Sequence, residues 1–166
     1  VVVVDIDPQA VLAQITELFK DVPAPVDPKA KDVITIPGND TPIVGILTDP
    51  ETRATNVQMV VKSDPMPKAY RAFGVGLMTD LVQETINQMF AERFNDIASR
   101  PDAPFLAAAA SFARINNVMD GFNVMAACKD GESLTAFAAA LAEVEKAKRF
   151  GFTAAESERA KANISA

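Results

Sequence analysis

Apolar residues recur with two different spacings in the first part of the chain. Residues 1–6 are a run dominated by valine and isoleucine, which predicts a buried strand. Asp7 and Pro8 follow in the pattern of a helix N-cap and a first helical residue. The apolar residues then repeat at helical spacing, so we predict an amphipathic helix over residues 8–20. Three prolines within residues 22–28 indicate a stiff linker and a domain boundary.

Three short strands are predicted next. Residues 33–36 and 43–47 are β-branched runs, and each ends at a turn that contains proline and aspartate. Residues 55–62 alternate between apolar and polar side chains, with Val57 and Met59 in the apolar set. This alternation is typical of a half-buried strand.

A long helical pattern covers residues 67–99, where apolar side chains recur at steps of three to five residues. Gly74 and Gly76 each cost up to about 1 kcal/mol in a helix relative to alanine, so a kink or break is expected near them. The two glycines also begin like a dinucleotide-binding fingerprint, but the third glycine is missing and no strand directly precedes them. We interpret them as small residues at which another element packs closely.

Residues 105–115 are ambiguous between helix and strand. Their four consecutive alanines favour a helix on propensity alone. However, Pro104 precedes them, and turn-forming residues follow at 116–117 and 120–121, after which residues 121–129 alternate. We therefore predict an antiparallel hairpin, in which the alanines leave room for a helix to pack close to the sheet.

Two helices are predicted at the end of the chain. The first covers residues 132–150 and ends at Gly151, in the usual helix-stop position. Thr153 and Glu156 have the spacing of a capping box, which opens the last helix. The apolar stripe expected on the first of these helices consists of Leu134, Phe137, Leu141 and Val144.

Histidine is absent from all 166 residues. Its absence excludes Ser-His-Asp and Cys-His catalysis within this chain. Catalytic zinc sites also generally need at least one imidazole, whereas a carboxylate site for magnesium or calcium stays open. The single cysteine, Cys128, allows no internal disulfide and follows an apolar run, so we expect it to be buried.

Charge and hydropathy narrow the function classes further. The net charge of −6 argues against a nucleic-acid-binding protein, which usually presents a basic face. No apolar run approaches the ~20 residues of a membrane span. The carboxylate pairs Asp80/Glu84 and Glu92/Asp96 lie at i,i+4 spacing, but basic residues are interleaved with them, and we interpret them as solvated helix faces.

Several segments resemble the insulinase/pitrilysin-like zinc metallopeptidases, in the same order along the chain. The strand and helix within residues 3–25 are similar to the close of the catalytic domain in that family, with Val4 where the family commonly has glycine. The segments ERFNDI, residues 92–97, and RPDAPF, residues 100–105, are similar to the second domain of long bacterial members. The last helices of that domain are matched by Gly151, Phe152, Thr153, Glu156, Arg159, Ala160 and Lys161.

The resemblance implies an α+β fold, in which an antiparallel β-sheet has helices packed on one face, as in the metallohydrolase domain repeat of the family. It also implies that residues 1–28 close the preceding, catalytic domain and that residues 29–166 form a second, non-catalytic domain. The family's zinc motif, His-x-x-Glu-His, would lie in that preceding domain. No catalytic, cofactor-binding or metal-binding residue is therefore assigned to this chain, and zinc is expected only in the rest of the protein.

The resemblance further implies a role in a zinc-dependent peptidase, as part of the chamber that encloses peptide substrates. The expected partners are other domains of the same protein and the peptide substrate, which an exposed strand edge would bind. Two alternatives stay open: a domain of a catalytically inactive homologue that acts in assembly or peptide binding, and an independent binding module. The resemblance favours a bacterial periplasm or cell envelope, and the cytoplasm stays open.

Overall fold

The computed structural model describes residues 7–165 except 31, 33 and 53, and the chain divides into two units, residues 1–33 and 34–166. The first unit contains helix α1 (Pro8–Phe19), which confirms the helix predicted at residues 8–20. The side chain of Asp7 caps this helix by accepting a hydrogen bond from the Gln9 N–H at 2.9 Å. The strand predicted at residues 1–6 lies outside the described residues.

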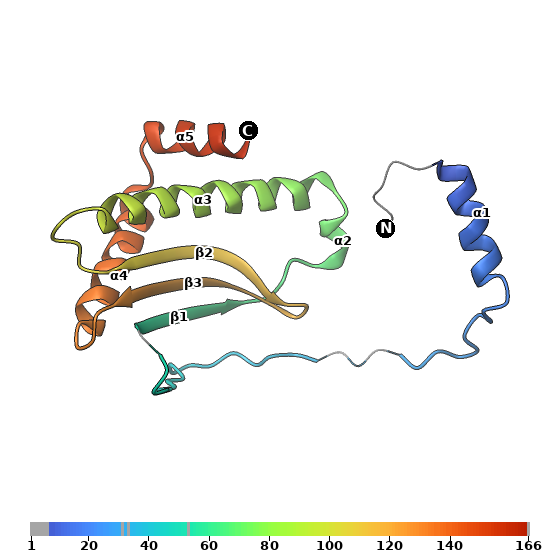
Figure 1. Ribbon diagram of the computed structural model, residues 1–166, viewed down its shortest axis with the longest axis horizontal. Coiled ribbons are helices and arrows are strands. Elements are labelled where there is room, and N and C mark those ends of the chain that lie inside the picture. Colours follow the sequence, from blue (N-terminus) through green and yellow to red (C-terminus); the bar gives the residue numbers. More distant parts are fainter. Residues whose placement is uncertain (1–6, 31, 33, 53, 166) are drawn as a thin grey trace. The chain divides into compact units, whose positions relative to one another are not determined.

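The second unit is an α+β domain, as the resemblance implied (Figure 1). Its sheet has three strands. Along the chain, two helices lie between the first and second strands, and two more follow the third strand. The elements are β1 (Thr55–Ser63), α2 (Lys68–Arg71), α3 (Gly74–Ala98), β2 (Ala107–Asn116), β3 (Met119–Cys128), α4 (Ser133–Phe150) and α5 (Ala154–Ile164).

The sheet is antiparallel throughout, with the spatial order β1-β3-β2. The predicted hairpin is confirmed, because β2 and β3 pair directly across a turn at residues 117–118. The turn is tighter than the sequence indicated: Asp120 and Gly121 had been expected in it, yet both pair within β3. A two-residue loop suffices to reverse the chain, so β3 starts at once.

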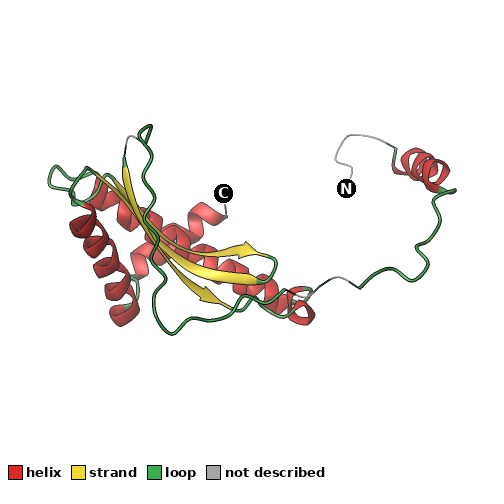
Figure 2. Ribbon diagram, turned by 90° about the horizontal axis from the view of Figure 1, so that it is seen from below, coloured by secondary structure: helices red, strands yellow, loops and turns green. Residues whose placement is uncertain are grey.

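One face of the sheet forms the core against the helices, which Figure 2 shows gathered behind the strands. Alternate residues of β3 point to that face, from Phe122 to Cys128, and Cys128 is buried as predicted. Helix α3 contributes Phe90 and Phe94, whose ring centroids lie 6.0 Å apart. Phe90 also contacts Phe152 edge-on, at 5.1 Å between centroids, so the loop before α5 joins the same core.

The buried stripe of α4 differs from the predicted one. Leu134 is 84% exposed, whereas Ala136 and Ala140 are fully buried. Leu141 and Val144 pack only at the margin of the core. Small side chains let the helix backbone approach β3 closely, and the larger residues then lie to either side of the contact line.

The strands predicted at residues 33–36 and 43–47 are wrong for the described residues, because residues 34–36 and 43–47 pair with no strand there. Ile43 is 82% exposed and Leu47 is 99% exposed. A β-branched run becomes a strand only when a neighbouring strand satisfies its backbone N–H and C=O groups. The sequence pattern reflects the side chains alone and does not show whether a neighbouring strand is present.

The expected break in the long helix is confirmed between α2 and α3. Gly76 lies against α2: a Cβ at this position would be 2.7 Å from the backbone oxygen of Arg71. Gly74 has open space around it. The prediction of a close approach therefore holds for Gly76 and is wrong for Gly74.

Candidate functional site

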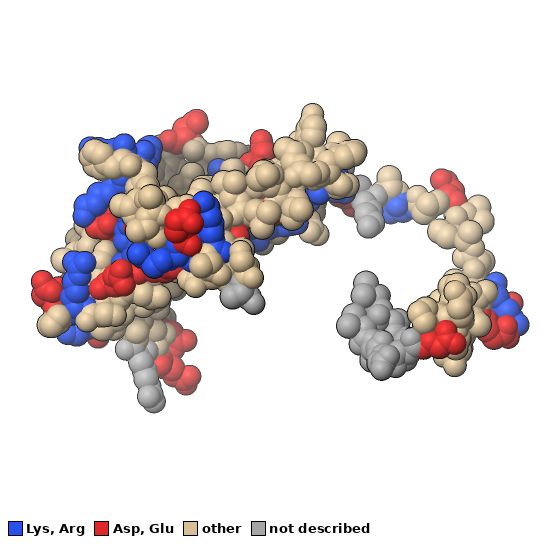
Figure 3. Space-filling model, turned by 90° about the horizontal axis from the view of Figure 1, so that it is seen from above, with Lys and Arg blue, Asp and Glu red and all other residues tan. Residues whose placement is uncertain are grey.

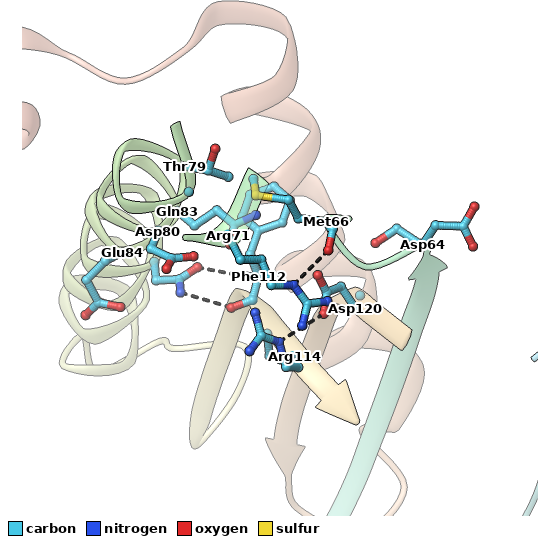
Figure 4. Close-up of a pocket in the computed structure, with 15 residues that line it drawn as sticks. Asp64, Met66, Arg71, Thr79, Asp80, Gln83, Glu84, Phe112, Arg114 and Asp120 are labelled. Carbon is cyan, nitrogen blue, oxygen red and sulfur yellow. Dashed lines mark hydrogen bonds and ion pairs between the residues drawn. The ribbon is translucent and has the colours of Figure 1, made fainter. Parts of the chain in front are cut away.

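A cleft of the second unit has a volume of about 750 Å³ and lies between α3 and the hairpin end of the sheet. Figure 4 shows Arg114 and Asp120 side by side on neighbouring strands that line it, with their Nε and Oδ1 atoms 3.6 Å apart. Arg71 donates a hydrogen bond to the backbone oxygen of Met66 at 2.7 Å. Both basic side chains of the cleft are arginines, which donate hydrogen bonds and accept none.

The carboxylates singled out in the sequence do not come together as a metal site. Among the described residues, no group of three or more Cys, Asp or Glu side chains has the geometry to hold a metal ion. Asp80 and Glu84 line the large cleft. Glu92 binds α5 instead, because it accepts hydrogen bonds from Arg159 at 3.1 Å and Asn163 at 2.9 Å. The interpretation of Glu92 as part of a solvated face is therefore wrong.

The outer edge of β2 is closed by helix α3. The Asn87 side chain donates to the Phe112 backbone oxygen at 3.1 Å and accepts from the Phe112 N–H at 2.8 Å, as a paired peptide unit would. The two bonds appear as dashed lines in Figure 4. Ala110 in the same strand is only 3% exposed. Asn87 therefore occupies the backbone groups of this edge at Phe112.

The outer edge of β1 pairs with no strand among the described residues. Because the backbone groups of Phe112 point away from β3, its pair with Phe122 is a non-hydrogen-bonded one. Phe122 therefore directs its N–H and C=O to its other partner, Val61 of β1. Alternate residues of β1 must then direct theirs outward, and these residues are Asn56, Gln58, Val60 and Lys62.

An apolar groove lies beside this edge on the helix face of the sheet. Its volume is about 400 Å³, and Met59 and Val61 form its β1 side. Leu141 and Val144 of α4 form the opposite side, and Lys148 lies among its few charged residues. Val61 is 52% exposed, so the groove opens toward the unpaired edge. We refer to the outward backbone groups of β1 together with this groove as the β1 edge site.

The sequence did not locate the β1 edge site. The alternation of residues 55–62 predicted that one side of this strand would be exposed, and the structure agrees for Asn56 and Gln58. Which edge of the sheet is free depends on the order β1-β3-β2 and on the position of α3. Neither can be deduced from the pattern of a single strand.

The fold and the site together define a small α+β domain with helices on one face of an antiparallel sheet. A model of the family described as "Peptidase M16 inactive domain" matches residues 1–164. The chain therefore belongs to the peptidase M16 family and corresponds to the family's inactive domain. The resemblance to insulinase/pitrilysin-like peptidases is confirmed.

A solved structure supports the same fold. The periplasmic protease PqqL from Escherichia coli superposes with a TM-score of 0.72 at 18% sequence identity. The match covers 96% of this chain and 17% of the PqqL chain, so this chain spans about a sixth of that relative. No curated protein sequence matches the chain significantly. Within the described residues, no helix is long and apolar enough to cross a membrane.

Proposed function

We propose that this chain is a non-catalytic domain of a zinc-dependent peptidase and that the open face of its sheet lines the chamber that encloses peptide substrates. The family match over residues 1–164 is the observation that carries the proposal. The described helices cover only one face of the sheet, and the other face presents Asn123 and Met125, which are half-buried. Gln58 donates to Asn123 on this face at 2.8 Å, so the face carries a polar pair.

The zinc site belongs to another part of the protein in this proposal. The chain has no histidine, and the carboxylates of its described residues form no metal-binding group, so in this proposal the chain contributes shape and binding surface. The PqqL relative is named a protease, which supports a catalytically active whole protein. In a catalytically inactive homologue the same face would bind peptides or partner chains without cleavage.

The division at residues 1–28 and 29–166 is part of the proposal. Helix α1 has an apolar stripe but no buried residue, and Leu12 and Leu18 on it are exposed. An amphipathic helix gains its stability mainly by burying such a stripe against another element. This need is satisfied if residues 1–28 complete the preceding domain.

Photo-crosslinking in the full-length protein tests the proposal. A photoreactive residue at Asn123, on the open face, is compared with one at Glu158, whose side chain is exposed on α5. A labelled peptide substrate is expected to crosslink at position 123 and not at position 158. Equal labelling at the two positions, or labelling at position 158 alone, would contradict a substrate-lining role for the open face.

A further inference from the structure

We propose that residues 64–73, which carry α2, form a strap that opens while the sheet and α3 stay folded, and that its opening controls access to the cleft between α3 and the β2–β3 hairpin. The strap is weakly anchored, it joins α3 beside a glycine in open space, and it forms one wall of the cleft. Its opening does not depend on the proposed function.

The strap has little buried apolar surface to hold it in place. Helix α2 is four residues long, and none of residues 68–71 is buried. The two aromatic side chains of the strap lie mostly in solvent, because Tyr70 is 57% exposed and Phe73 is 67% exposed. A helix of one turn is not stable without packing. Segments with few buried contacts open at a smaller free-energy cost than the whole domain, so we expect the strap to open first.

The backbone hydrogen bonds of the strap are local. The Tyr70 N–H donates to the Pro67 oxygen at 2.9 Å, and the Phe73 N–H donates to the Tyr70 oxygen at 3.2 Å. The Gly76 N–H donates to the Phe73 oxygen at 2.9 Å, which joins the strap to the first turn of α3. Gly74 lies between the strap and this turn, in open space, so backbone rotation there meets little steric resistance. Opening the strap at Gly74 therefore leaves the rest of α3 intact.

The strap forms one wall of the cleft and carries its own latch. Asp64, Met66 and Arg71 of the strap line the cleft, whereas the other walls belong to α3 and to the β2–β3 hairpin. The Arg71 Nε atom donates to the Met66 backbone oxygen at 2.7 Å, which Figure 4 shows as a dashed line. This part-buried hydrogen bond closes residues 66–71 into a loop. Because Arg71 both lines the cleft and closes the loop, loss of the bond should loosen this wall.

Native-state hydrogen exchange in the full-length protein tests the opening. Amides 70–76 should exchange at least about tenfold faster than the amides of β3, at a rate that low concentrations of urea hardly change, because local opening exposes little surface. Exchange in β3 should accelerate with urea, because it requires a larger unfolding. If amides 70–76 exchange at the same rate and with the same urea dependence as β3, the strap opens only with the sheet and the inference is overturned.

A pair of arginine variants tests the latch. Arg71→Met removes the hydrogen bond to Met66 and should accelerate exchange at amides 70–76 by about fivefold. Arg114→Met removes the other arginine of the cleft, which lies on β2 outside the strap, and should change the same rates by less than about twofold. Equal effects of the two variants would contradict the latch. If Arg71→Met does not fold by circular dichroism, Arg71→Gln replaces it with the same expected direction.

Cysteine labelling tests the control of access. The natural Cys128 is buried, so it adds little background. A cysteine at Thr79 lies on α3 in the cleft, whereas a cysteine at Ala91 lies at an exposed position of the same helix outside the cleft. Arg71→Met should raise the rate of labelling by a bulky maleimide about fivefold at position 79 and less than about twofold at position 91. An equal increase at both positions, or an increase at neither, would overturn the inference.

Discussion

At the residue scale, a charged cluster joins α3 to the start of α5. Arg93 donates to the Glu156 Oε1 atom from Nε at 2.9 Å and from Nη2 at 2.7 Å, and both side chains are more than four-fifths buried. Arg93 also lies over the Phe152 ring, 4.8 Å from its centroid. Thr153 and Glu156 complete the capping box that the sequence predicted. The sequence thus indicated the cap, but not the Arg93 partner, because that contact spans 63 positions.

Replacing Arg93 with methionine should destabilise the chain by about 2 kcal/mol, because Glu156 would remain largely buried without its charged partner. Urea unfolding at neutral pH measures this loss. Arg159→Met is the matched control: Arg159 pairs with Glu92 at 3.1 Å but is 56% exposed, so about 0.5 kcal/mol is expected. Similar losses in the two variants would show that the Arg93 pair has no special role.

Glu156 should also make stability depend on pH. Burial opposes its ionisation, but hydrogen bonds from the Thr153 backbone N–H and from Arg93 outweigh burial, so the pKa of Glu156 is lowered in the folded chain. Its ionised form therefore contributes stability that is fully present above the unfolded pKa of about 4.3 and is lost as pH falls through the lower, folded pKa. The stability difference between the natural chain and Glu156→Gln should shrink as pH falls across this window. A difference that stays constant from about pH 7 to about pH 3 would refute the assignment.

At the element scale, local patterns predicted what depends on neighbouring residues and failed where distant partners decide. Helices α1 and α4 and the β2–β3 hairpin were predicted because caps, stops and turns are local signals. The run at residues 43–47 has the same β-branched character as a strand but lacks a partner among the described residues. On α4, the alanines proved to be the buried stripe because closeness to β3 is a property of the packing, which hydrophobicity alone does not reveal.

The break between α2 and α3 gives a prediction at this scale. Gly76→Ala should destabilise the chain, although alanine favours helix by about 1 kcal/mol, because the new Cβ would meet the Arg71 backbone at 2.7 Å. Gly74→Ala, in open space two residues earlier, should be neutral or stabilising by up to about 1 kcal/mol. Thermal unfolding of the two variants measures the contrast. Stabilisation by Gly76→Ala would show that α2 does not pack closely against this position.

At the scale of the whole molecule, the absence of histidine is consistent with membership of the family's inactive domain. The free edge, the open face and the grooves of the sheet contain no histidine. None of them can therefore hold a histidine-activated nucleophile that attacks a peptide bond. In the face that Figure 3 shows, acidic and basic side chains are interspersed. Segment order in the sequence was enough to identify the family, whereas the position of the β1 edge site required the topology.

The most direct test of the non-catalytic role is a peptidase assay on the purified 166-residue chain. The chain is incubated with zinc and a quenched fluorescent peptide, with and without a chelator, beside the full-length protein. We predict no cleavage by the chain under either condition, because it lacks the histidines that a catalytic zinc ion requires. Robust cleavage that the chelator abolishes would contradict the account.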